Sequence, residues 1–137
     1  KDRGCFLLTP IEESTSEDYS INSELSEIEI PVRLTFKSEK TLKKVDSKSL
    51  MLDKAKLKFP LTIRKWKRSD YFYPSGLKGS KKLSKFFKDE KYSLLKKESQ
   101  WLLCSGEDIV WVIGKRADQR FLADAVTKDK WLIRYHE

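Results

Sequence analysis

Short apolar segments separated by turn residues dominate this sequence and limit the folds that it can adopt. The clearest pattern lies between residues 28 and 36, where every second residue is apolar: Ile28, Ile30, Val32, Leu34 and Phe36. Because successive side chains of a strand point to opposite faces, this period of two predicts one half-buried strand.

The same signals predict further strands and the loops between them. Apolar segments bounded by turn residues place strands at 4–9 (closed by Pro10), 50–52, 61–65, 101–104, 109–113 and 131–135. Polar, charged or Pro- and Gly-containing stretches are predicted loops: 12–26, 38–48 and 70–76. The stretch 105–108 is predicted to be a plain hairpin loop.

Two short helices are predicted among these strands. Ser80 is placed to cap a helix in which Leu83, Phe86 and Phe87 share one face. The opposite face of that helix would carry four lysines: Lys81, Lys82, Lys85 and Lys88. A second helix is predicted at 93–98. The predicted fold class is therefore α+β and β-rich, with a small antiparallel β-barrel-like sheet and one or two short helices.

Length and composition exclude several classes of protein. The 137 residues correspond to one domain, or to one domain with an appended arm. The longest apolar run, 109–113, is far shorter than the roughly 18 residues that a membrane span requires. The start shows no secretory signal, so we expect Cys5 and Cys104 to be reduced cysteines of a cytoplasmic protein. A start without methionine indicates a piece of a longer chain.

The sequence offers little for catalysis or metal binding. His136 is the single histidine, so neither a catalytic triad nor a Cys/His zinc set can form. The stretch 105–108 resembles a Ser-Gly-Gly-x-Asp-Ser phosphate loop only superficially, because the second glycine and the final serine are missing and a strand follows. We expect no catalytic residue, metal or cofactor in this piece, and we expect Asp70 to cap a turn or orient an arginine.

The charge is concentrated in the middle of the chain. The net charge is +8, but residues 1–30 carry two bases and eight acids, whereas residues 31–97 carry 21 bases and six acids. Such a distribution is typical of a surface that meets phosphates, although a lysine-rich solvated surface is the alternative.

Two clusters are candidates for anion binding. Gly76, Gly79 and Ser80 precede the predicted lysine face, where free backbone N–H groups attract phosphate. The second cluster interleaves Trp66 with bases: Arg64, Lys65, Lys67 and Arg68. The alternative for this second cluster is that Trp66 belongs to the core and the bases are solvated.

Several of these segments resemble the C-terminal domain of bacterial tRNA(Ile)-lysidine synthetase. The matching segments are Leu57–Trp66, Asp70–Pro74, Gly79–Phe87, Trp101–Ser105, Ile109–Arg116 and Arg120–Phe121. The resemblance covers residues 50–137 as the family domain and only loosely matches 1–49, a segment with strands and an acidic loop. Ser69 stands where a glycine is expected and Tyr92 where a proline is common.

The resemblance implies a function for the whole protein and a narrower one for this piece. The family enzyme is an ATP-dependent ligase that joins lysine to the wobble cytidine of an isoleucine tRNA. Its ATP-binding loop, and with it ATP, magnesium and lysine, belongs to an N-terminal catalytic domain. This piece is implied to be a small β-barrel with helices that grips tRNA, largely at the acceptor-stem side, and that is inactive alone.

The predicted tRNA-binding residues combine the family positions with the two basic clusters. The family positions are Arg64, Gly79, Lys81, Lys82, Lys85 and Arg116, and the clusters add Lys65, Arg68 and Lys88.

Two alternative functions remain open. One is a stand-alone RNA-binding module with a KH-type loop at 76–79, which is disfavoured because residues 71–75 cannot extend a helix into that loop. The other is a structural domain that mediates homodimerisation or docks to the rest of the enzyme.

Overall fold

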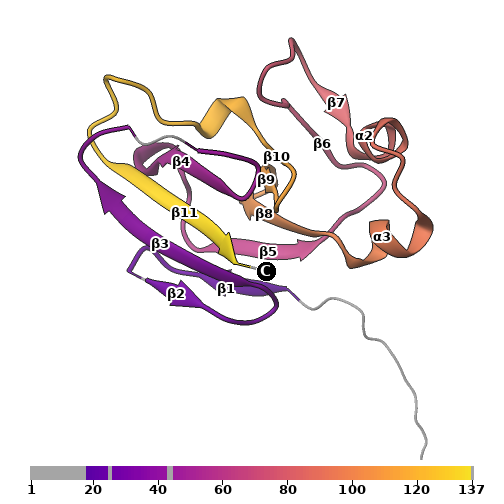
Figure 1. Ribbon diagram of the computed structural model, residues 1–137, viewed down its shortest axis with the longest axis horizontal. Helices are drawn as coiled ribbons and strands as arrows, with labels where there is room; N and C mark the ends of the chain where they lie inside the picture. Colours follow the sequence, from indigo (N-terminus) through magenta and orange to yellow (C-terminus); the bar gives the residue numbers. More distant parts are fainter. Residues whose placement is uncertain (1–17, 25, 43–44, 137) are drawn as a thin grey trace, which may run out of the picture.

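Two antiparallel sheets form most of the fold in this computed structural model, which describes residues 18–24, 26–42 and 45–136 (Figure 1). The larger sheet has the order β1-β5-β8-β9-β10, with strands Tyr19–Ile21, Leu61–Lys65, Trp101–Ser105, Asp108–Val112 and Arg116–Ala117. The smaller sheet has the order β2-β3-β11-β4, with strands Glu27–Ile28, Arg33–Glu39, Lys130–His136 and Ser49–Asp53. The β-rich α+β class is confirmed, although both sheets are open and no closed barrel forms among the described strands.

Strand β11 is the centre of the smaller sheet. It pairs over its whole length with β3, from Lys130 opposite Glu39 to His136 opposite Arg33, and its other edge pairs with β4. In the larger sheet, β1 pairs with β5. Strands from before residue 50 therefore contribute to both sheets.

The first hydrophobic core lies between the two sheets. Its buried side chains come from β3, β4 and β11 of the smaller sheet and from β1, β5, β8 and β9 of the larger one. The Trp131 ring stacks on Phe36 with centroids 4.9 Å apart and meets the edge of Phe59 at 5.6 Å. Burial of such rings contributes most of the free energy that holds two sheets together.

A second core covers the other face of the larger sheet. The short hairpin β6 (Tyr71–Phe72) and β7 (Lys81–Lys82) and the helices α2 (Leu83–Asp89) and α3 (Leu94–Ser99) lie together on this side (Figure 1). Phe72, Leu83, Phe86 and Phe87 pack there against β8 and β9. Strands β8 and β9 are buried on both faces, which explains why their sequences are nearly continuous apolar runs.

A buried ion pair attaches the α2 side of the molecule to the larger sheet. The Arg64 guanidinium, from β5, donates to both carboxylate oxygens of Asp70 at 2.9 and 3.0 Å, and both side chains are less than a tenth exposed. The same carboxylate accepts the backbone N–H of Lys67 at 2.7 Å, and the Asp70 carbonyl accepts the N–H of Leu83, the first residue of α2. Asp70 therefore orients an arginine, as expected, and also holds the start of the helix.

Most predicted strands and both predicted helices are confirmed within a residue or two. The predicted hairpin loop is also confirmed, since β8 pairs with β9 around Gly106, whose φ is +61°. The predicted strand at 4–9 lies outside the described residues. No helix in the described ranges has both the length and the apolar character needed to cross a bilayer.

The predicted continuous strand over 28–36 is wrong. β2 ends at Ile28 and β3 begins at Arg33, and the Ile30 side chain between them is 67% exposed. Pro31 has no N–H to donate to a neighbouring strand, and this interrupts the ladder despite the apolar alternation.

The predicted helix start at Ser80 is also wrong. Lys81 and Lys82 lie on β7, and α2 begins at Leu83 without a side-chain cap. Pairing with β6 competes with helix formation at these two lysines, and the Asp70 carbonyl replaces the cap. Two predicted loops likewise contain short strands, β1 within 12–26 and β6 within 70–76.

We predict that Asp70→Ala destabilises the protein by about 3–5 kcal/mol, because it leaves a buried guanidinium without its carboxylate. Chemical denaturation of the 137-residue chain measures this loss, with Asp129→Ala as the control because that residue is exposed. Hydrogen exchange of the α2 amides is expected to accelerate more than that of β11. A loss no larger than that of the control would contradict this role.

Candidate nucleic-acid interface

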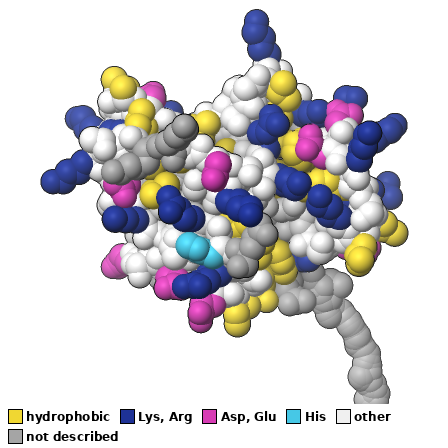
Figure 2. Space-filling model, in the orientation of Figure 1, with side chains coloured by type: hydrophobic (Ala, Val, Ile, Leu, Met, Phe, Trp, Pro, Cys, Tyr) yellow, Lys and Arg dark blue, Asp and Glu magenta, His cyan; other side chains and the backbone are white. Residues whose placement is uncertain are grey.

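Residues 66–100, which form the α2 side of the molecule and are called the basic lobe below, concentrate positive charge. They include ten lysines and arginines and four acids. Figure 2 shows dark blue side chains spread over this lobe, from the tip of the β6–β7 loop to the edge of the molecule. The lobe is therefore the surface best suited to attract a polyanion.

A hollow of about 420 Å³ lies between the β6–β7 loop and α2 and is called the basic hollow. Four lysines, two serines, a glycine and two apolar residues line it: Lys78, Lys81, Lys82, Lys85, Ser80, Ser84, Gly79, Pro74 and Leu77. It brings together four of the nine predicted tRNA-binding residues, namely Gly79, Lys81, Lys82 and Lys85.

Local backbone geometry shapes this hollow. Gly76 and Gly79 have φ values of +84° and +75°, a region that residues with a Cβ rarely adopt. The Leu77 N–H donates to the Pro74 carbonyl at 3.1 Å, which closes the turn. The backbone pairing of Tyr71 with Lys82 then brings the chain back beside β6, directly before the start of α2.

The four lysines of the hollow differ in whether their ammonium groups are available to bind an anion. The Lys81 ammonium pairs with Asp89 of α2, and this hydrogen bond lowers the pKa of the Asp89 carboxyl, with further contributions from the charges of Lys81, Lys85 and Lys88. Within the described residues, Lys78, Lys82 and Lys85 form no ion pair, and all three are exposed. Three ammonium groups are thus available to an anion, whereas Lys81 is held by its own carboxylate.

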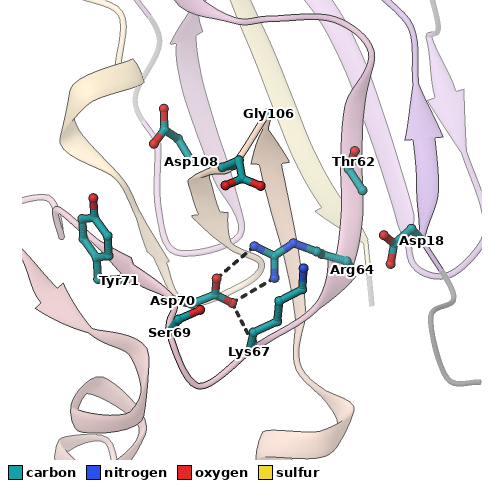
Figure 3. Close-up of a pocket in the computed structure, with 10 residues that line it drawn as sticks. Asp18, Thr62, Arg64, Lys67, Ser69, Asp70, Tyr71, Gly106 and Asp108 are labelled. Atoms are coloured by element: carbon teal, nitrogen blue, oxygen red, sulfur yellow. Dashed lines mark hydrogen bonds and ion pairs between the residues drawn. The ribbon is translucent and has the colours of Figure 1, made fainter.

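The structure separates the Arg64 cluster from the basic hollow. Figure 3 shows Arg64 reaching from β5 to Asp70 in a different hollow, of about 490 Å³, whose lining includes four carboxylates: Asp18, Asp70, Glu107 and Asp108. Lys65 donates to the Glu98 carbonyl and lies 4.2 Å from the Trp101 ring centroid. Arg68 is exposed on the β5–β6 turn.

The two remaining predicted residues lie elsewhere. Arg116, on β10, donates to the Ser75 carbonyl at 3.1 Å, which supports the chain that leads into the β6–β7 loop. Lys88 is exposed on α2.

Sequence analysis did not identify the role of Asp89. It lies four residues after Lys85, which in a helix predicts a pair with that lysine, but its partner is Lys81 of β7. That contact depends on the β7–α2 junction, which sequence periodicity does not reveal. The apolar wall of the hollow, Pro74 and Leu77, was likewise visible only as a turn signal.

Comparison with known proteins identifies relatives along most of the chain. The family described as TilS substrate C-terminal domain matches residues 61–134. The tRNA(Ile)-lysidine synthase of Parabacteroides distasonis is 40% identical and aligns with 98% of this chain and 32% of its own length. The corresponding protein of Bacteroides thetaiotaomicron is 37% identical, over 93% of this chain and 28% of its own length. The chain thus spans about a third of the length of these relatives.

The fold agrees with a solved structure. A crystal structure of a TilS C-terminal domain superposes with a TM-score of 0.72 and covers 88% of this chain and 97% of that chain, at 19% identity. Since the family model extends over more than half of the 137 residues, the chain belongs to the TilS substrate C-terminal domain family.

Proposed function

We propose that this chain is the tRNA-binding C-terminal part of a tRNA(Ile)-lysidine synthase and that the basic hollow contacts the RNA backbone. The single observation that carries this proposal is the group of three unpaired ammonium groups, Lys78, Lys82 and Lys85, around one hollow in a domain of this family. The relatives that share the chain are named as tRNA(Ile)-lysidine synthases.

In this proposal, the chemistry of the whole enzyme is carried out by a part of the polypeptide outside this chain. The family resemblance implies a ligase that uses ATP, magnesium and lysine. The described residues do not fit an ATP site of that kind, because Ser105–Asp108 turns directly from β8 into β9 and no helix N-terminus follows. The role proposed for the basic lobe is to hold tRNA while the catalytic part acts on the anticodon.

The hollow is suited to backbone contacts without base recognition. Ammonium groups on flexible stems neutralise phosphates and release condensed counterions, a contribution to affinity that does not depend on sequence. Leu77 is 46% exposed at the rim and offers an apolar side chain against which a ribose can pack. In this proposal, charge and shape position the tRNA, and other parts of the enzyme recognise its bases.

The three available lysines provide the direct test. We predict that replacing Lys78, Lys82 and Lys85 by glutamate in the full-length synthase weakens binding of a tRNA(Ile) transcript. The slope of log K against log salt concentration should fall by about three, one for each lost phosphate contact. A charge-matched control replaces three exposed lysines outside the lobe by glutamate: Lys40, Lys56 and Lys128. Equal affinities and slopes for the two variants would refute the proposed interface.

Releasing Lys81 from Asp89 is expected to strengthen tRNA binding, whereas loss of the three available lysines is expected to weaken it. Because the hydrogen bond from Lys81 lowers the pKa of the Asp89 carboxyl from its ordinary value, the pair persists at neutral pH and is lost only as the pH falls through that lowered pKa. The substitution Asp89→Asn releases Lys81 at pH 7, so we expect tighter tRNA binding and a salt slope steeper by about one.

Glu90→Gln is the control for this substitution, because it removes the same charge from the next residue, for which no ion pair is present among the described residues. If both variants tighten binding equally, the effect is one of overall charge and Lys81 has no special role.

A further inference from the structure

Two lysines from different segments lie over the ring of Tyr92. The Lys96 ammonium, on α3, is 4.5 Å from the ring centroid, and the Lys115 ammonium, in the turn after β9, is 5.8 Å from it. The ring itself is fixed by stacking on Phe87 of α2, with centroids 4.7 Å apart. The aromatic face stabilises cations held above it and keeps them near one another.

One side chain, Gln100, ties the three parts of this arrangement together. Its carbonyl oxygen accepts the Tyr92 hydroxyl at 2.7 Å, and its amide donates to the carbonyls of Trp101 and Ile113 at 2.8 and 2.9 Å. Ile113 lies two residues before Lys115, and Gln100 directly follows α3. The Lys115 N–H also donates to the Val112 carbonyl at 2.8 Å, which holds the turn. Both lysine-bearing segments are therefore positioned before any ligand arrives.

The two ammonium groups have no compensating partner in the described part of the protein. Neither forms an ion pair there, and Glu90 is the only acid whose charge favours the protonated form of Lys96. The contact and charge of Lys115 lower the pKa of Lys96, with a smaller contribution from desolvation. Like charges held together in this way are relieved by an anion that bridges them.

We propose that Lys96 and Lys115 jointly bind one phosphate of the RNA backbone, at a contact point where the β9–β10 turn adjoins the basic lobe and separate from the basic hollow. This inference rests on the proposed function for the identity of the anion as RNA. Helix α2 links the two points, because Lys85 lines the basic hollow and Phe87 supports the Tyr92 ring.

The first experiment measures tRNA binding by the full-length synthase with Lys96→Gln and Lys115→Gln combined. We expect the dissociation constant to rise several-fold and the salt slope to fall by about one, because one shared phosphate is lost. The control removes two exposed positive charges outside the lobe, with Lys40→Gln and Lys128→Gln. A double variant that matches this control in affinity and slope would overturn the proposal.

The second experiment tests the anion site without RNA, on the 137-residue chain. NMR titration of the Lys96 ammonium should show its pKa rising toward the ordinary value of a lysine when inorganic phosphate is added, because the anion offsets the charge of Lys115. The Lys115→Gln variant should show a high Lys96 pKa without phosphate and little further change with it. A Lys96 pKa that does not respond to phosphate, or that responds only to a polyglutamate peptide, would refute the phosphate site.

The two experiments separate this inference from the proposed function. Suppose that the glutamate variant of the basic hollow binds tRNA normally while the Lys96 and Lys115 variant does not. The basic hollow is then not an RNA contact, and the contact at Lys96 and Lys115 is supported. If the wild-type synthase binds no tRNA, the RNA assignment fails together with the proposed function. The phosphate titration then decides whether the lysine pair is an anion site.

Discussion

The buried pair of Arg64 and Asp70 is the interaction on which the arrangement of the basic lobe depends. A guanidinium and a carboxylate that are both removed from water must satisfy one another closely, because either one alone would be costly. In satisfying Arg64, Asp70 also fixes the turn at Lys67 and the first N–H of α2. The ion pair between Arg64 of β5 and Asp70 thus helps to set the position of the lysines on β7 and α2 relative to the sheets, together with the second core.

Charge in this protein divides into groups that hold the fold and groups that face outward. Asp118 is fully buried and accepts the backbone N–H of Tyr73 together with the Arg120 guanidinium, so both members of that pair are structural. Around the basic hollow, Lys78, Lys82 and Lys85 are exposed and form no ion pair among the described residues, whereas Lys81 is half-buried and paired with Asp89. Net charge alone does not distinguish these groups, because a buried, paired arginine and an exposed lysine each contribute one positive charge.

The sequence predicted the strands and the apolar helix face well, because each depends on local periodicity. Leu83, Phe86 and Phe87 are buried as their spacing requires, and β8 and β9 appear where two apolar runs flank a glycine turn. One error has a non-local cause, because the Asp70 carbonyl takes over the capping role expected of Ser80. The other has a local cause, because Pro31 interrupts the alternating pattern in which it stands.

For the candidate site, the sequence predicted that several lysines lie beside a glycine-containing loop, but not which of them are already paired. The loop glycines and the lysines that follow them do gather around one hollow. The pairing of Lys81 with Asp89, and the meeting of Lys96 and Lys115 over Tyr92, bring together residues from separate elements, which only the folded chain reveals.

Strands β8 and β9 act as a partition with a hydrophobic core on each side. Leu103 faces the core between the sheets, whereas its neighbours Leu102 and Cys104 face the core beneath α2. Both cores therefore depend on the same two strands, although α2 and β6 contribute only to the second core. A change in either strand therefore reaches both cores at once, so the surface of the lobe and the packing between the sheets share one strand framework.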